Sequence, residues 1–165
     1  MPWPHNFGLP LHSRWAVLSA ALGVEMLSGA QYAFGIFSNL LKDHFVLTQG
    51  EVDNIGLMAN IGGNIAVHVG YIFDEYGPKP TCALAGLQGV VGFLWMWASV
   101  KFSLPMSIGG LMALSTLQGH ACAWTDVATI PLLAASFPNH KGTAIGFSKA
   151  FVGLSGAIFA QIYVA

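Results

Sequence analysis

Five long apolar segments, separated by short polar stretches, restrict this chain of 165 residues to one kind of architecture. Each segment has roughly twenty residues or more, the length that an α-helix needs to cross the hydrocarbon core of a bilayer. The predicted spans cover about 15–41, 52–73, 81–100, 105–136 and 142–165. We therefore expect an all-α fold, a polytopic transmembrane helical bundle. Residues 1–13, which are rich in proline, are predicted to form a mobile N-terminal tail.

The composition argues against most other classes of protein. Hydrophobic residues make up 55% of the chain and charged residues only 8%, whereas soluble domains contain roughly 25% charged residues. A net charge of −1 offers no basic face to nucleic acid. Cys82 and Cys122 lie in apolar segments without metal-ligand spacing, and no catalytic or phosphate-binding motif is apparent. We expect no enzymatic activity, no cofactor and no metal, and the lipid bilayer as a partner.

A charged hairpin between the second and third segments contains Gly70, Asp74, Gly77 and Lys79. Gly70 would let a neighbouring helix approach closely, and Asp74 can accept hydrogen bonds from a facing helix end. Gly77 and the proline after it turn the chain, while Lys79 stays at the membrane interface. The spacing resembles G-x-x-x-D-x-x-G-x-[RK], the signature between the second and third helices of the major facilitator superfamily. Glu75 stands where that signature usually has a basic residue.

Three further stretches, at 28–42, 47–53 and 137–163, resemble the nodulin-like branch of this superfamily. The resemblance implies a transporter with twelve helices in two halves and a substrate site between the halves. Residues 14–165 would then form an incomplete nodulin-like domain, five helices of the six-helix N-terminal half, and the C-terminal half is the expected missing partner. Related branches include carriers of oxalate, formate and other monocarboxylates, which implies a small organic anion as substrate.

Small residues recur every four positions on two of the predicted helices. The two sets are Gly62, Ala66 and Gly70 on the second helix, and Gly142 and Gly146, continued by Gly153 and Gly156, on the fifth. Such faces allow close contact between helix backbones in a bilayer. We interpret both sets as packing seams, which could also slide during a transport cycle.

Polar side chains inside the apolar segments are the candidate functional residues, because their burial in a bilayer is costly. The candidates for a substrate path are Glu25, Tyr32, Asn60, Asn64, His120, Asp126 and Lys149. Glu25 and Tyr32 lie on nearly the same face of the first helix, which lines the central cavity in the superfamily. Asn60 and Asn64, with His68, share the face of the second helix opposite its small residues. The alternative for these residues is a structural role, such as hydrogen bonding between helices.

Lys149 is the one lysine predicted to lie within the membrane. A pair with Asp126 or Glu25 would reduce the cost of burying both charges. In two alternatives Lys149 binds an anionic substrate or extends to the cytosolic interface. Our hypothesis is a charge-coupled site, in which protonation of a carboxylate frees Lys149 for an anion.

The sequence therefore favours the N-terminal part of a multi-pass secondary transporter, for a small organic anion such as a monocarboxylate, that works by alternating access. The alternative is a non-transporting membrane sensor or assembly protein built on a transporter-like half. A second six-helix half downstream would favour the transporter.

Overall fold

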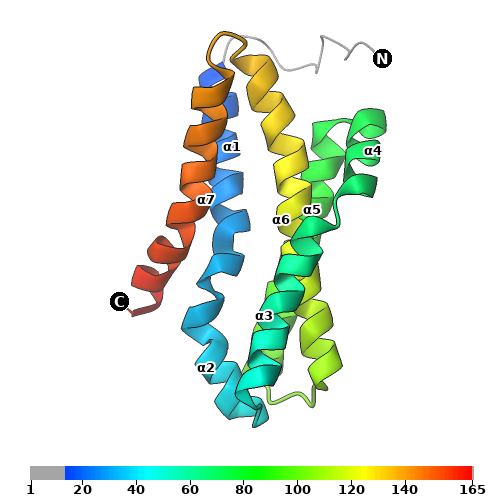
Figure 1. The fold of residues 1–165 in the computed structure, drawn as a ribbon, viewed down its shortest axis with the longest axis vertical. Coiled ribbons are helices and arrows are strands. Elements are labelled where there is room, and N and C mark those ends of the chain that lie inside the picture. Colours follow the sequence, from blue (N-terminus) through cyan, green and yellow to red (C-terminus); the bar gives the residue numbers. More distant parts are fainter. Residues whose placement is uncertain (1–13, 165) are drawn as a thin grey trace.

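The computed structural model describes residues 14–164, which form helices joined by short turns (Figure 1). In chain order the elements are α1 (Arg14–Ser28), the 3₁₀-helix η2 (Gly29–Ala33), α2 (Phe34–Phe45), α3 (Gln49–Asn64), α4 (Val67–Tyr76), α5 (Pro78–Lys101), α6 (Ile108–Ser136) and α7 (Lys141–Val164). The described residues contain no strand, so the all-α prediction is confirmed. The predicted mobile tail, residues 1–13, lies outside the described residues.

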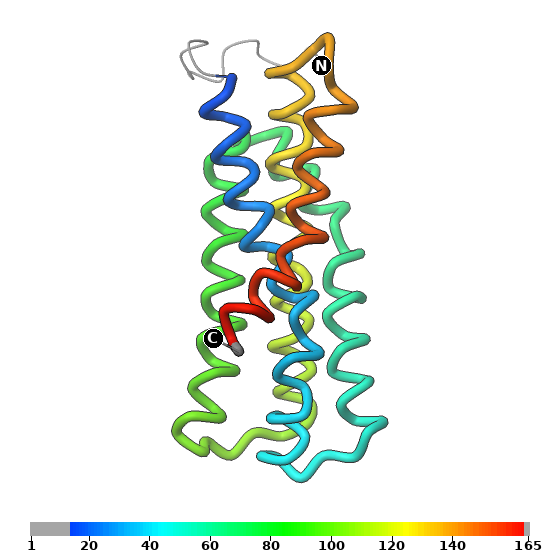
Figure 2. The backbone as a smooth tube through the Cα atoms, turned by 90° about the vertical axis from the view of Figure 1, so that its left-hand side faces the viewer, coloured from blue at the N-terminus to red at the C-terminus, as the bar shows by residue number. Residues whose placement is uncertain are grey.

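The helices run alternately between the two ends of an elongated bundle (Figure 1). The start of α1, the α4–α5 hairpin and the α6–α7 turn lie at one end, and the α2–α3 and α5–α6 turns lie at the other. Helix α6 packs against α3 and α5 and also against α1 and α7. Figure 2 looks onto α1 and α7, where the later part of α7 crosses η2. Helix α6 is therefore shared by two groups of helices.

The first predicted segment, 15–41, is interrupted by the tighter turns of η2. A Cβ atom at Gly29 would lie only 2.7 Å from the carbonyl oxygen of Val152 on α7. Because glycine has no Cβ atom, the two backbones can meet at this point. The helix then continues as α2 and ends at Val46, which has a left-handed conformation with φ of 54°.

The second predicted segment, 52–73, begins earlier than expected and is bent. The Thr48 hydroxyl accepts a hydrogen bond from the Glu51 amide, and the Glu51 carboxylate accepts one from the Thr48 amide at 2.7 Å. This capping box starts α3 at Gln49. Regular helical structure is interrupted at Ile65 and Ala66, and α3 and α4 meet at an angle of 42°.

The third and fourth segments begin at residues that suit a helix start. Pro78 begins α5, because a proline at the first helical position has no amide hydrogen that needs a partner. Helix α6 starts at Ile108, three residues after the predicted start, since the Ser107 hydroxyl accepts a hydrogen bond from the Gly110 amide.

Judged by length and mean hydropathy, α5 and α7 can each cross a membrane, and the bent pair α3 and α4 makes a third candidate span. The first segment is divided into shorter helices, and α6 carries several polar residues. For the first and fourth predicted segments, 15–41 and 105–136, the crossing of the membrane therefore stays a prediction.

Backbone contact between α3 and α6 depends on two glycines. A Cβ atom at Gly62 would overlap the carbonyl group of Thr116, and one at Gly119 would overlap that of Ala59. Gly62 thus belongs to a packing seam, as predicted. The close approach expected at Gly70 is wrong for the described part of the chain, because no atom there lies within 4 Å of a Cβ built at this position.

The predicted glycine seam on α7 also differs from the structure. No described atom lies within 4 Å of a Cβ built at Gly142, Gly146 or Gly153, and only Gly156 has neighbours, on Tyr32. The face of α7 that is buried within residues 14–163 carries Ala144, Ser148, Val152 and Ser155. This face packs on α1 and η2, and of the four glycines only Gly156 borders it.

Gly77 forms the tight hairpin between α4 and α5. Its φ of 81° and ψ of −173° lie in a region that is nearly restricted to glycine. The Gly77 carbonyl accepts a hydrogen bond of 2.8 Å from the buried Thr81 hydroxyl. Asp74 and Lys79 are exposed, and Asp74 accepts none of the expected hydrogen bonds within the described residues. The turn therefore depends on Gly77 and Thr81.

We expect Gly77→Ala to destabilise the protein by about 1–2 kcal/mol, because a Cβ atom disfavours this backbone conformation. Thermal unfolding in detergent micelles measures the effect. Gly70→Ala is the matched control, since it adds the same atom one helix earlier where no described neighbour is close. Equal stabilities of the two variants would contradict this account of the hairpin.

Candidate functional site

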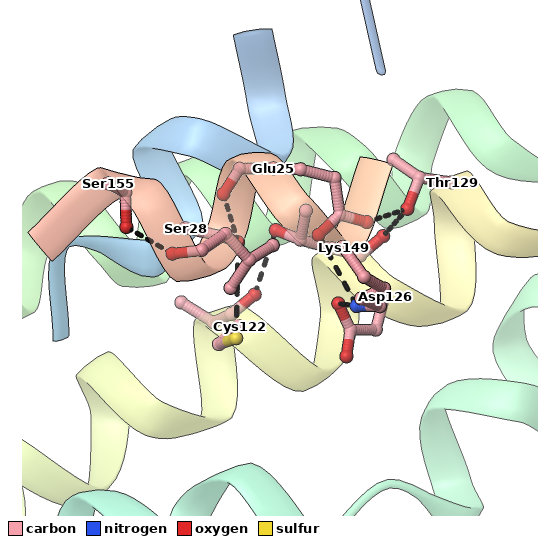
Figure 3. A network of polar contacts seen from close by, with 10 residues as sticks. Glu25, Ser28, Cys122, Asp126, Thr129, Lys149 and Ser155 are labelled. Carbon is pink, nitrogen blue, oxygen red and sulfur yellow. Dashed lines mark hydrogen bonds and ion pairs between the residues drawn. The ribbon is translucent and has the colours of Figure 1, made fainter. Parts of the chain in front are cut away.

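A network of charged and polar side chains lies where α1, α6 and α7 meet (Figure 3). Glu25 comes from α1, Asp126 and Thr129 from α6, and Lys149 from α7. Glu25 is completely buried, whereas the side chains of Lys149 and Asp126 are each 36% exposed. The network thus has a closed end at Glu25 and a more open end at Lys149 and Asp126.

Lys149 contacts both carboxylates at once. Its Nζ atom lies 3.4 Å from Oε2 of Glu25 and also donates to Oδ1 of Asp126. The second oxygen of Glu25, Oε1, accepts a hydrogen bond from the Thr129 hydroxyl. Both oxygens of this buried carboxylate therefore have partners, as a buried charge requires. The predicted pairing of Lys149 with a carboxylate is confirmed, and it includes Glu25 and Asp126 together.

Helix geometry explains why α6 supplies two members of the network. Residues three apart on an α-helix share a face, so Asp126 and Thr129 both point toward α1 and α7. The Thr129 hydroxyl oxygen also lies 2.9 Å from the Thr125 carbonyl oxygen, so its one hydrogen is shared between this carbonyl and the Glu25 carboxylate. On α1, Ser28 donates to the Glu25 carbonyl at 2.9 Å, and the Cys122 thiol lies 3.9 Å from the Ser28 hydroxyl oxygen. The polar contacts therefore continue from Glu25 toward η2.

The charges in this network do not balance. Two carboxylates share one ammonium group, so the ionised network has an excess of one negative charge among apolar helices. Excess charge in a region of low dielectric constant is unfavourable. Such a network can take up a proton on a carboxylate. It can also exchange one of its own carboxylates for a carboxylate ligand on Lys149, and the more open Asp126 is the one suited to this exchange.

The other candidates do not join this network. The Tyr32 side chain is 60% exposed, and its backbone lies beside Gly156. Asn60 and Asn64 are exposed and donate to carbonyl groups of their own helix, at 3.4 Å and 2.8 Å. The hydrogen bonds between helices that we considered for these two residues are therefore absent from the described part of the chain.

His120 lies on another face of α6 and forms a second polar cluster. Six residues separate it from Asp126, which is roughly 240° of helical rotation. Its Nδ1 atom lies 2.6 Å from Oε1 of Gln88 on α5, and its Nε2 atom lies 3.0 Å from Nε2 of His68 on α4. The Trp124 indole donates to the same Nε2 atom at 3.3 Å. Helices α4, α5 and α6 therefore meet at one imidazole ring.

Thr129 and Gln88 are not among the functional residues predicted from the sequence. Thr129 could have been found from its position one turn after Asp126. Gln88 carried the same signal as the other candidates, a polar side chain inside the predicted segment 81–100, but only the packing of α5 on α6 brings it to His120.

A helical bundle with long apolar helices and an internal charge network defines an integral, multi-pass membrane protein. The sequence pattern of the family described as Nodulin-like matches residues 14–165. The chain therefore belongs to the nodulin-like family of the major facilitator superfamily, as its hairpin and the three further stretches predict.

Relatives from plants, bacteria and fungi match most of the chain. Protein NUCLEAR FUSION DEFECTIVE 4 of Arabidopsis thaliana is 24% identical over 91% of this chain and 26% of its own length. The oxalate:formate antiporter of Oxalobacter formigenes is 28% identical over 87% of this chain and 34% of its own length. An uncharacterized membrane protein of Saccharomyces cerevisiae is 22% identical over 84% of this chain and 25% of its own length. No solved structure matches the chain. The chain thus spans about a quarter to a third of these relatives.

Proposed function

We propose that the chain is the N-terminal part of a secondary transporter for small organic anions, and that Lys149 binds the anion. The observation that carries this proposal is the Lys149 ammonium group, held inside the bundle between Glu25 and Asp126. A cation that is already paired with carboxylates can accept a carboxylate ligand in place of one of them. The relative named as an oxalate:formate antiporter supports monocarboxylates and oxalate as the substrates to test.

Proton uptake is the second part of the proposed mechanism. When Asp126 takes up a proton, it no longer neutralises Lys149, and the ammonium group becomes available to an anion. Glu25 keeps its hydrogen bond from Thr129 and continues to hold Lys149 in place. Release of the proton restores the contact between Lys149 and Asp126 and displaces the anion. Alternating access also requires a second helical half that faces this one, so the proposal concerns the protein in which both halves are present.

The proposal is tested by uptake of labelled oxalate and formate into proteoliposomes that contain the protein at the full length its gene encodes. We expect Lys149→Gln to reduce uptake by about 30-fold or more, because it removes the cation that pairs with the anion. Lys101→Gln is the matched control, since Lys101 is an exposed lysine at the end of α5.

Normal uptake by Lys149→Gln would disprove the role of Lys149. If the native protein bound these anions but transported none of them, the sensor or assembly hypothesis would replace transport.

A further inference from the structure

The cluster around His120 lies beside the break between α3 and α4, on a different face of α6 from Lys149. His68 is the second residue of α4, which starts after the interruption at Ile65 and Ala66. The rings of His68 and His120 have centres 4.9 Å apart, while their Nε2 atoms are 3.0 Å apart. The two ring planes are tilted by 22° to each other in a stacked arrangement. The separation of the two Nε2 atoms is that of an N–H···N hydrogen bond, with room for one proton between them.

Two independent contacts fix the protonation state of His120. The Gln88 amide nitrogen donates to the Leu84 carbonyl at 3.2 Å, which leaves its oxygen to accept a hydrogen from His120 Nδ1. The Trp124 indole nitrogen can only donate, so the Nε2 atom of His120 that it contacts must be an acceptor. Both contacts give a neutral His120 with its hydrogen on Nδ1.

The proton between the two rings therefore belongs to His68. His68 then donates from Nε2 and shares the single lone pair on His120 Nε2 with the longer contact from the Trp124 indole, so a second proton can enter only at Nδ1 of His68. His68 is exposed, so this atom is open to protonation. The Trp124 side chain packs in a buried cluster with Val69 of α4 and Ala85 of α5, which keeps the indole donor in position.

No other ionisable group contacts the pair among residues 14–164. On α4, the exposed Tyr71 phenol lies three residues after His68, and Asp74, Glu75 and Tyr76 lie at the far end of the helix. On α5 the charged residues, Lys79 and Lys101, lie at the two termini. The carboxylate of α6, Asp126, is paired with Lys149. On α3, the charged residues, Glu51 and Asp53, lie in the first turns, far from the break. A proton on His68 would therefore be stabilised by its hydrogen bond to His120 rather than by a carboxylate.

We propose that His68 and His120 form a proton-binding site at the break between α3 and α4, in which His68 takes the proton and His120 stays neutral. Protonation turns the bond between the rings into a charge-assisted hydrogen bond, which is roughly twice as strong as a neutral one. The tie between α4 and α6 is then tighter when the proton is bound. This site is separate from Lys149, and its existence does not depend on transport of an anion.

The test is nuclear magnetic resonance of ¹⁵N-histidine in the full chain in lipid bilayers. A coupling across the Nε2–H···Nε2 bond identifies the pair in the native protein, without any substitution. As the pH is lowered we expect His68 to gain a second N–H, while Nε2 of His120 stays unprotonated. Protonation of His120 before His68, or the absence of the coupling, would overturn the proposal.

Hydrogen exchange of the α4 amides tests the consequence for the helix. At low pH we expect α4 to exchange about five- to tenfold more slowly in the native protein than in His68→Gln, and at high pH we expect a smaller difference. His140→Gln is the control, because His140 is an exposed residue in the α6–α7 turn. If the ratio of the α4 exchange rates in His68→Gln and in the native protein were the same at both pH values, the proposed stabilisation of α4 by the proton would be disproved.

Discussion

Replacement of Lys149 with methionine is expected to destabilise the bundle by about 3–4 kcal/mol at pH 7. The variant leaves Glu25 completely buried without its cation, and loss of one partner of a buried ion pair is costly. The loss has an upper bound, since Glu25 can take up a proton instead, and neutralising an ordinary glutamate at pH 7 costs about 3–4 kcal/mol. Unfolding in mixed micelles measures the effect.

The same variant should become more stable as the pH falls. In the folded variant Glu25 carries a proton, whereas in the unfolded chain it is ionised at neutral pH. The folded state then binds one more proton than the unfolded state, so its stability rises by about 1.4 kcal/mol for each unit decrease in pH. The gain ends when the pH reaches the range in which an unfolded glutamate is itself protonated.

Two further variants make this prediction specific to the ion pair. The double variant with Glu25→Gln and Lys149→Met removes the buried charge together with its partner and should recover most of the lost stability. Lys101→Met should change stability by about 0.5 kcal/mol or less, because Lys101 is exposed. A double variant no more stable than Lys149→Met alone would contradict the account of Glu25.

Gly119→Ala should destabilise the protein by about 3 kcal/mol, at the upper end of the usual range for an overpacked core. The added methyl group would overlap the carbonyl of Ala59, and neither helix backbone can move aside without separating α3 from α6. Thermal unfolding gives the loss of stability, and a cross-link between α3 and α6 reports their separation.

Gly86→Ala is the matched control for this substitution. Gly86 lies inside α5, and no described atom is within 4 Å of a Cβ atom built there. Alanine is the better helix former by about 1 kcal/mol, so this variant should be as stable as the native protein or more stable. If Gly119→Ala were equally well tolerated, the direct contact between α3 and α6 would be disproved.

The helical fold was predictable from the sequence because apolar segments of this length leave few alternatives in a bilayer. The breaks were not predictable in the same way. Gly29 reads as one more glycine in an apolar helix, and its importance depends on the approach of Val152 from a distant part of the chain. Neither a proline nor a charged residue lies at Ile65 and Ala66 to signal the interruption of the helix there.

The charged residues of the candidate site, and their pairing, were predictable from the sequence. A single intramembrane lysine and two carboxylates had few other partners to choose from, so Lys149 could be paired in advance. The sequence could not show that both carboxylates bind it together, since that depends on how α1, α6 and α7 pack. It also could not bring His68 to His120, which are 52 residues apart in the chain.

Binding of oxalate to the full-length protein in bilayers, measured at several pH values together with proton uptake, tests the central claim most directly. If Lys149 accepts the anion when Asp126 is protonated, the affinity should rise as the pH falls, and about one proton should be taken up for each anion bound. Lys149→Gln should abolish both effects. Binding of the same strength at every pH, unchanged in Lys149→Gln, would contradict the proposed site.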